Sequence, residues 1–250
     1  MRYLGIILFL TLLATSCKKD SFTAESDFGY AYQPGELGHW VDYEVDSFYF
    51  SDITIPATID TAHYYIREFL DTSYTDASGA EVIRVEQYKK YNLNDPWIID
   101  EVGSFKLSKE NFQRYFKDLR FMNLLFPVRD DNEWQGNIFL NVNNEATLEY
   151  LDDSKYDWRY RYTYSNEPIQ IGSFLLDSCL QVIQIDEENL FEKKYSEEIY
   201  ARGIGLVSKE MIILNTQAPP SSQPFLERAQ SGFILRYKLI DYKHWKNIQL

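Results

Sequence analysis

The amino-acid sequence predicts a mainly β fold: an antiparallel, strongly curved sheet or (half-)barrel of about eleven strands, with one or two short helices. Three observations predict this class. Short apolar segments recur along the chain, and Gly, Pro, Asn and Asp separate them. No long helical pattern lies between them, which favours antiparallel pairing of successive strands. The 20 Tyr and 16 Phe suit the pleated, half-wet surface of a sheet.

Recognisable turns separate the predicted strands of the N-terminal part. The first strand follows Pro34-Gly35, and a slip in its alternation predicts a β-bulge. The second and third strands flank the turn residues 75–79 and are expected to form a long hairpin. These predicted strands are 39–50, 62–70, 81–91 and 97–107.

Residues 108–119 predict a short helix. Ser108 is a suitable N-cap, and four apolar side chains recur behind it at helical spacing. The apolar segment 121–128 follows and is predicted to be buried. The four side chains at helical spacing are Phe112, Tyr115, Phe116 and Leu119.

The C-terminal half repeats the strand pattern. Residues 159–164 alternate cleanly and place Tyr160, Tyr162 and Tyr164 on one face, either as core or as the lining of a ligand groove. In 191–199 the odd-numbered residues mix polar and apolar side chains, as in a half-wetted strand. The predicted strands of this half are 134–142, 146–151, 159–164, 173–185, 191–199, 206–214 and 232–242.

Two glycines, Gly203 and Gly205, precede one of these strands. A dinucleotide-binding loop requires a helix at that place. The glycines therefore predict a turn or a bulge. Residues 215–224, which contain three of the eight Pro, are expected to form a loop.

The first sixteen residues predict an export signal. Arg2 precedes an apolar run, 4–14, that is too short for a membrane-spanning helix. We divide the chain into a signal peptide at 1–16, a lipidated Cys with a flexible tether at 17–28, and a single β-rich domain at 29–250. Two β units with a boundary near Asn143 are the alternative.

The end of this leader, Ala14-Thr15-Ser16-Cys17, resembles the lipobox of bacterial lipoproteins, with Ala14 where Leu is more usual. The resemblance implies cleavage before Cys17 and acylation of that residue, for instance with palmitate. It also implies a lipid-anchored protein of the outer membrane, on the periplasmic face or the cell surface. An ordinary cleaved signal that contains a Cys is the alternative.

Three further stretches resemble a family of uncharacterised Bacteroidetes lipoproteins. They are 32–45 (YQPGELGHWVDYEV), 125–128 (LFPV) followed by Trp134 and Gly136, and 200–210 (YARGIGLVSKE). The family has no assigned catalytic residues, so the resemblance implies lineage and location but no activity. Asp60-Thr61-Ala62 resembles the short O-glycosylation motif of exported Bacteroidetes proteins, and a plain loop before a strand is the alternative.

The net charge limits the possible binding partners, and the cysteine content limits the possible disulfides. The formal net charge of −13 and the absence of a dense Lys/Arg cluster argue against a nucleic-acid partner. If Cys17 carries lipid, Cys179 has no intramolecular partner, because the chain contains two Cys. Its strand-like surroundings predict a buried, unreactive thiol.

No catalytic, cofactor or metal site is predicted. His39, His63 and His244 are far apart and lack zinc-site spacing. The acidic stretch 130–133 (DDNE) lacks the spacing of a calcium loop, so a solvated turn is favoured over a calcium site. Hydrolase and phosphate-loop motifs are absent from the sequence.

These patterns predict a cell-envelope lipoprotein that binds or associates rather than catalyses. The expected partners are the membrane, through the N-terminal lipid, and an unknown protein or a small apolar ligand. The alternative is an envelope glycan hydrolase that uses paired carboxylates. No pair among the 38 acidic residues stands out in the sequence.

Overall fold

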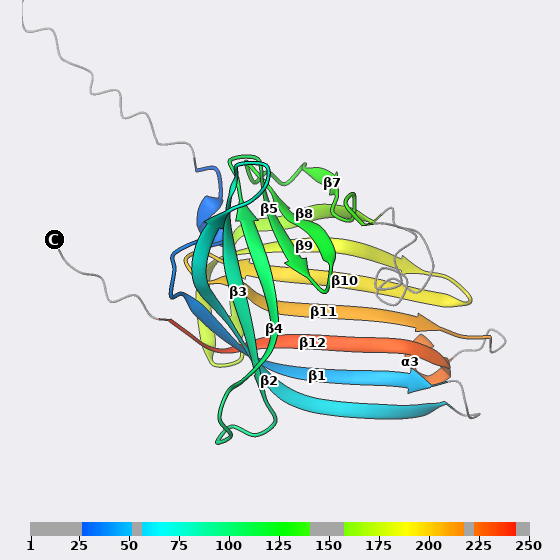
Figure 1. Ribbon diagram of the computed structural model, residues 1–250. Coiled ribbons are helices and arrows are strands. Elements are labelled where there is room, and N and C mark those ends of the chain that lie inside the picture. The colour runs from blue at the N-terminus through cyan, green and yellow to red at the C-terminus, as the bar shows by residue number, and fades with distance from the viewer. Residues whose placement is uncertain (1–26, 52–56, 141–157, 218–222, 244–250) are drawn as a thin grey trace, which may run out of the picture.

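The computed structural model describes residues 27–51, 57–140, 158–217 and 223–243, and confirms a mainly β protein. Twelve strands form one antiparallel, nearly closed, barrel-shaped sheet, together with a 3-10 turn, η2 (Tyr30–Tyr32), and a short helix, α3 (Phe225–Arg228) (Figure 1). The strands are β1 (Trp40–Ser51), β2 (Thr58–Thr75), β3 (Glu81–Lys90), β4 (Ile98–Leu107), β5 (Asn111–Phe116), β6 (Leu119–Leu125), β7 (Glu133–Gln135), β8 (Arg159–Ile171), β9 (Phe174–Glu188), β10 (Glu192–Ala201), β11 (Gly205–Asn215) and β12 (Ser231–Tyr242).

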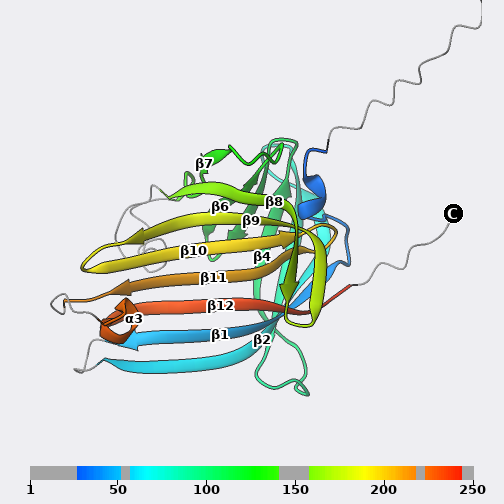
Figure 2. The ribbon, with the colours of Figure 1, turned by 180° about the vertical axis from the view of Figure 1, so that it is seen from behind.

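The order of the strands joins the two halves of the chain in one sheet. From edge to edge it runs β6-β5-β4-β3-β2-β1-β12-β11-β10-β9-β8-β7, so β1 pairs with β12. The second half of the chain, with β1 and β2, forms a long wall, and β3 to β6 curve across one face of it (Figures 1 and 2).

Side chains and a backbone contact close the seam between the two edges. The Met122 amide on β6 donates to the Gly136 carbonyl beyond β7, at 2.8 Å. The Tyr162 hydroxyl donates to the Leu125 carbonyl, at 2.7 Å, and accepts from the Leu125 amide, at 2.8 Å. Tyr162 thus satisfies backbone groups that the edge of a sheet would otherwise leave unpaired.

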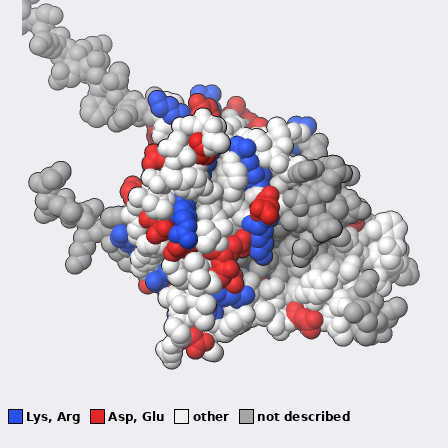
Figure 3. All heavy atoms as spheres, in the orientation of Figure 1, with Lys and Arg blue, Asp and Glu red and all other residues white. Residues whose placement is uncertain are grey.

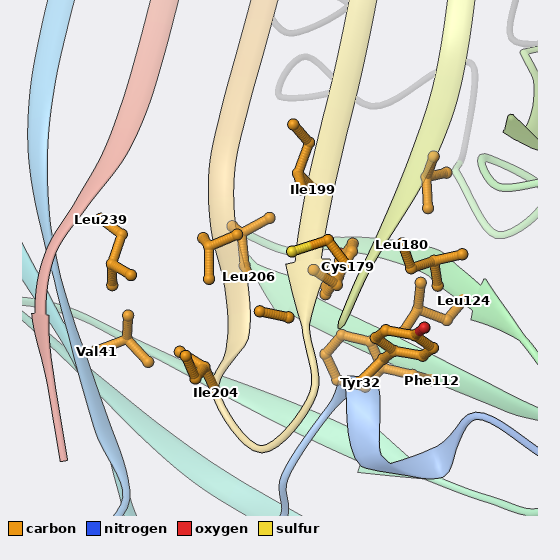
Figure 4. Close-up of a cluster of buried hydrophobic side chains, with 14 of the residues drawn as sticks. Tyr32, Val41, Phe112, Leu124, Cys179, Leu180, Ile199, Ile204, Leu206 and Leu239 are labelled. Carbon is orange, nitrogen blue, oxygen red and sulfur yellow. The ribbon is translucent and has the colours of Figure 1, made fainter. Parts of the chain in front are cut away.

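The main core lies between the wall and the strands that cross it. It contains Val41, Phe112, Leu124, Leu180 and Leu206, which come from five different strands (Figure 4). A smaller cluster packs beside α3, where Phe225 covers Phe50, Leu214 and Ile234. No described helix is long and apolar enough to cross a membrane.

Most of the predicted strands are confirmed. The hairpin expected around residues 75–79 exists as β2 and β3, and β2 begins four residues earlier than predicted. The bulge expected in the first strand lies at Asp42/Tyr43, in the pairing of β1 with β12. Gly203 lies in the β10–β11 turn and Gly205 begins β11, with φ of 73° and 101°, a conformation that favours glycine.

The helix predicted over 108–119 is wrong. These residues form β5 and the start of β6, joined by a tight turn in which Lys117 and Asp118 have φ of 50° and 60°. Phe112 is buried against Phe105 of β4, with ring centroids 5.0 Å apart. Pairing with β4 and packing in the core therefore override a local helical spacing.

Of two other predicted strands, one is shorter than predicted and one cannot be compared with the structure. The strand predicted at 134–142 is only three residues long, β7, and a turn follows it. Gly136 lies at that turn, and a Cβ there would lie 2.2 Å from the Tyr160 ring. Only glycine therefore fits at the position where the chain leaves β7. The strand predicted at 146–151 lies outside the described residues.

Candidate functional site

A cluster of charged side chains lies inside the barrel. Arg114 of β5 donates from Nη2 to Glu68 of β2. Lys209 of β11 lies 3.1 Å from Glu198 of β10, between Nζ and Oε1. The two carboxylate side chains are only 7% and 1% exposed. Buried charges are rare in protein interiors unless they are paired, so this cluster is a specific feature of the fold.

Glu198 is the centre of this cluster. Its Oε2 accepts from the Asn123 Nδ2, at 3.0 Å, and from the Tyr200 hydroxyl. Burial opposes ionisation of Glu198, but the charges of Lys209 and Arg114 and these two hydrogen bonds outweigh burial and lower its pKa. Glu198 is therefore held as a carboxylate.

Arg114 remains charged although it is buried. Burial by itself would lower the pKa of the guanidinium, but the charges of Glu68 and Glu198 raise it above its usual value. The rings of Phe105 and Phe116 lie 5.2 and 5.1 Å from the guanidinium carbon. Burial raises the pKa of Tyr43 and of Tyr200 well above the usual value, so both hydroxyls remain neutral donors.

The alternation of β10 explains how charges enter the interior. Its even-numbered residues Lys194, Ser196, Glu198 and Tyr200 are buried, whereas the odd-numbered Lys193, Tyr195 and Glu197 are partly exposed. Both faces of this strand carry charges, so one charged face has to be buried. This alternation was the one sequence signal available for the charge cluster. None of the cluster residues was among the predicted site residues.

A cavity of about 200 Å³ adjoins the cluster. It lies between the β5–β6 turn and the wall formed by β9 to β12. Charged, amide and aromatic side chains all contribute to its surface. They are Gln87, Glu101, Arg114, Phe116, Lys117, Leu119, Phe121, Asn123, Tyr160, Gln184, Glu198, Leu206, Lys209, Leu235 and Tyr237.

One residue that lines the cavity, Asn123, has a buried polar atom without a partner in the described part of the chain. The Asn123 Oδ1 is buried and accepts no hydrogen bond from the chain as described, while Nδ2 of the same amide is bound to Glu198. Asn123 is only 3% exposed. An unpaired buried acceptor costs roughly 1–3 kcal/mol, so this position favours a bound group that donates a hydrogen bond.

The tyrosines of the predicted face pack in or against the core, and one of them also lines the cavity. Tyr160 and Tyr162 are buried, which confirms their predicted place in the core. The Tyr160 hydroxyl donates to the Asn137 Oδ1, at 2.9 Å, and its ring also lines the cavity. Tyr164 is half-buried, and burial raises the pKa of its hydroxyl to about 12.

Cys179 is buried in the main core, as predicted (Figure 4). Its Sγ lies 3.8 Å from the Leu176 carbonyl. Burial raises the pKa of the thiol to about 11, so it is protonated at neutral pH and is not a nucleophile. Cys17, the predicted lipidation site, lies outside the described residues.

The histidines and the acidic stretch are not brought together. His39 donates from Nε2 to the Ile204 carbonyl, at 2.8 Å, whereas His63 lies 2.8 Å from Asp46 on the exposed side of the sheet. His244 lies outside the described residues. Residues 130–132 connect to β7 through a turn, where Asp130 accepts from the Ser165 hydroxyl, and Glu133 is the first residue of β7. The described residues contain no group of three His, Cys, Asp or Glu placed to hold a metal ion.

The surface carries mixed charges. On the face shown in Figure 3, Lys and Arg intermingle with Asp and Glu, and no basic patch forms there. Thr61, in the sequence that resembles an O-glycosylation motif, is exposed on β2. Its modification stays a prediction.

Comparison with known proteins finds only low sequence identity. No family model matches this chain, and no curated protein matches it. One solved structure that aligns with it is a protein provisionally classed as a lipoprotein from Parabacteroides distasonis, with 11% identity and a TM-score of 0.38, covering 85% of this chain and 98% of that one. Another is a protein provisionally classed as exported, with a YmcC-like fold, from Bacteroides fragilis, with 10% identity and a TM-score of 0.35, covering 84% and 98%. Similarity this distant assigns neither family nor function.

Proposed function

We propose that this chain is a lipid-anchored protein of the bacterial cell envelope that binds a small, polar, hydroxyl-bearing molecule inside its barrel. The observation that carries the binding proposal is the interior cavity, which is lined by Asn123, a residue whose buried Oδ1 has no partner within the described chain. A ligand hydroxyl there would donate to this oxygen. Arg114 and Lys209, which line the cavity, are already paired with Glu68 and Glu198, which favours a ligand without net charge.

The size and polarity of the cavity restrict the ligand. At about 200 Å³ the cavity has the volume of roughly seven water molecules, and it is smaller than most drug-sized pockets. An apolar ligand would cover the charged side chains of Glu101 and Lys117 without replacing their contacts with water, which costs free energy. A single sugar ring or a small polyol combines suitable size, hydroxyl donors and an apolar face for rings such as Phe121 and Tyr237.

Calorimetric titration tests this proposal. The full chain in detergent is titrated with glucose, galactose, N-acetylglucosamine and glycerol, and with decanoic acid as the apolar comparison. Leu235 lines the cavity with an uncharged side chain, so Leu235→Trp is expected to fill the cavity and weaken binding at least about tenfold. Leu175→Trp is the matched control, because Leu175 is 67% exposed and remote from the cavity. Binding of decanoic acid alone, or equal binding by both variants, would contradict the proposal.

The proposed location rests on the leader sequence. The short apolar run at 4–14 and the small residues before Cys17 are those of a cleaved, acylated signal. Several acyl chains on one Cys would anchor the protein durably, since each buried CH₂ contributes about 0.8 kcal/mol. Cys17→Ser is expected to abolish incorporation of labelled palmitate and to release the protein from the outer-membrane fraction. Unchanged retention would contradict the anchor.

Glycan hydrolysis is the second candidate, because Glu101 and Glu198 line the same cavity. Hydrolysis of a glycoside requires one carboxyl group that donates a proton. The lowered pKa of Glu198 argues against that role for Glu198, and Glu101 is the other carboxyl group that lines the cavity. Release of nitrophenol from nitrophenyl glycosides by the wild type, and its loss in Glu101→Gln, would support hydrolysis. Binding without turnover would support the first proposal.

A further inference from the structure

The N-terminal half of β2 is an open edge of the sheet. Within the part of the chain that the structure describes, residues Thr58 to Tyr64 pair with β1 on one side, and the ladder with β3 begins only at Tyr65. Six consecutive residues, 58–63, are exposed. In Figures 1 and 2 this part of β2 forms the lower rim of the wall. An open edge presents a row of unpaired N–H and C=O groups, and the partner it fits is another extended strand.

We propose that this edge pairs with the same edge of a second copy of the chain, as an antiparallel, two-fold symmetric β2–β2 ladder centred on Thr61. Thr61 is the midpoint of the open segment, so this register uses its full length and ends where β3 begins. A strand that extended further would meet Lys90, which already occupies the place opposite Tyr65.

The side chains of the segment are compatible with this register. Thr61 lies opposite Thr61 of the second copy, a favourable cross-strand pair. Asp60 then faces Ala62, and Ile59, which is 51% exposed, faces His63. No like charges lie directly opposite each other. The two Asp60 side chains lie diagonally, roughly 7–8 Å apart and in water, so salt is expected to strengthen the contact.

Other open edges of the described sheet are less suited to this pairing. Residues 98–102 of β4 lie beyond its ladder with β5, but self-pairing about their midpoint would place Asp100 against Asp100. The outer part of β8 contains Pro168 and three register shifts in its pairing with β9, features that protect an edge. Residues 58–64 of β2 contain no Pro, and their pairing with β1 contains no register shift.

Disulfide cross-linking of the full chain in native membranes tests the proposal. In an antiparallel pair the two Cα atoms at the centre lie about 4.5–5.5 Å apart, within reach of a disulfide. Thr61→Cys is therefore expected to give at least about fivefold more covalent dimer on a non-reducing gel than Leu175→Cys, at a residue of β9 that is also exposed. Ala62→Cys, one residue along the same edge, is expected to give less dimer than Thr61→Cys. Cys17 and Cys179 are common to all three variants.

Two results would overturn the proposal. The first is an equal yield of covalent dimer from Thr61→Cys and Leu175→Cys. The second is an intact mass of the wild-type protein that shows a glycan on Thr61, because a glycan at the centre of the ladder would hold the two strands apart. A Thr61 that carries no glycan, together with selective cross-linking at this residue, would support the pairing.

Discussion

Asn123 on β6 donates from Nδ2 to Oε2 of Glu198 on β10, 3.0 Å away, although 75 residues separate the two in the chain. This bond joins an edge strand of the sheet to a strand of the long wall. The Oδ1 of the same amide has no partner within the described chain, and Asn123 is one of the residues that line the cavity. Asn123 therefore links the structural charge cluster to the proposed ligand site.

Glu198→Gln is expected to destabilise the protein by about 3–5 kcal/mol, because Lys209 and Arg114 would lose a buried counter-charge. The free energy of unfolding in urea measures this loss. Glu188→Gln is the control: Glu188 lies 2.7 Å from Lys193 in an exposed pair and should cost less than about 1 kcal/mol. Equal losses in the free energy of unfolding for the two variants would show that the buried cluster stabilises the protein no more than an exposed ion pair does.

Stability is expected to fall as the pH drops below about 6.5, in part because of His39. Burial lowers the pKa of His39, and the charges of Glu36 and Lys243 act on it in opposite directions. Because the folded-state pKa is the lower one, the unfolded chain binds more protons in this range, so acid favours unfolding. His39→Gln should flatten the dependence of Tm on pH between about 5 and 7. If the dependence of Tm on pH is the same in His39→Gln as in the wild type, His39 does not contribute to the loss of stability in acid.

Gly136→Ala is expected to cost about 1–3 kcal/mol, because the new methyl group would lie 2.2 Å from the Tyr160 ring. Combining it with Tyr160→Val removes the clash, so the double variant should lose less stability than the sum of the two single variants. Urea unfolding of the four proteins in this cycle measures the coupling. Simple additivity would mean that the Tyr160 ring does not set the requirement for glycine.

Cys179 should react slowly with Ellman's reagent in the folded protein. With a pKa of about 11 and full burial, roughly one thiol in a thousand is ionised at pH 8. Unfolding in guanidinium should expose one thiol per chain if Cys17 is acylated, and two if it is not. Rapid reaction in the folded state would contradict the burial of Cys179.

The strands were predictable and the charge cluster was not. Alternation along 159–164 and the turn at 75–79 are local signals, and β8, β2 and β3 follow them. The helix predicted over 108–119 failed because Phe112 packs against Phe105, a contact that depends on the neighbouring strand. Glu68, Arg114 and Glu198 come from three strands, and only the curvature of the sheet brings them together.

A crystal structure of the protein purified from its native membrane tests the central claim most directly. We expect electron density in the cavity for a small hydroxylated molecule, with one of its oxygens about 2.7–3.0 Å from the Asn123 Oδ1. A cavity that holds only ordered water, in crystals grown both with and without 50-fold excess of the sugar that binds most tightly, would contradict the account.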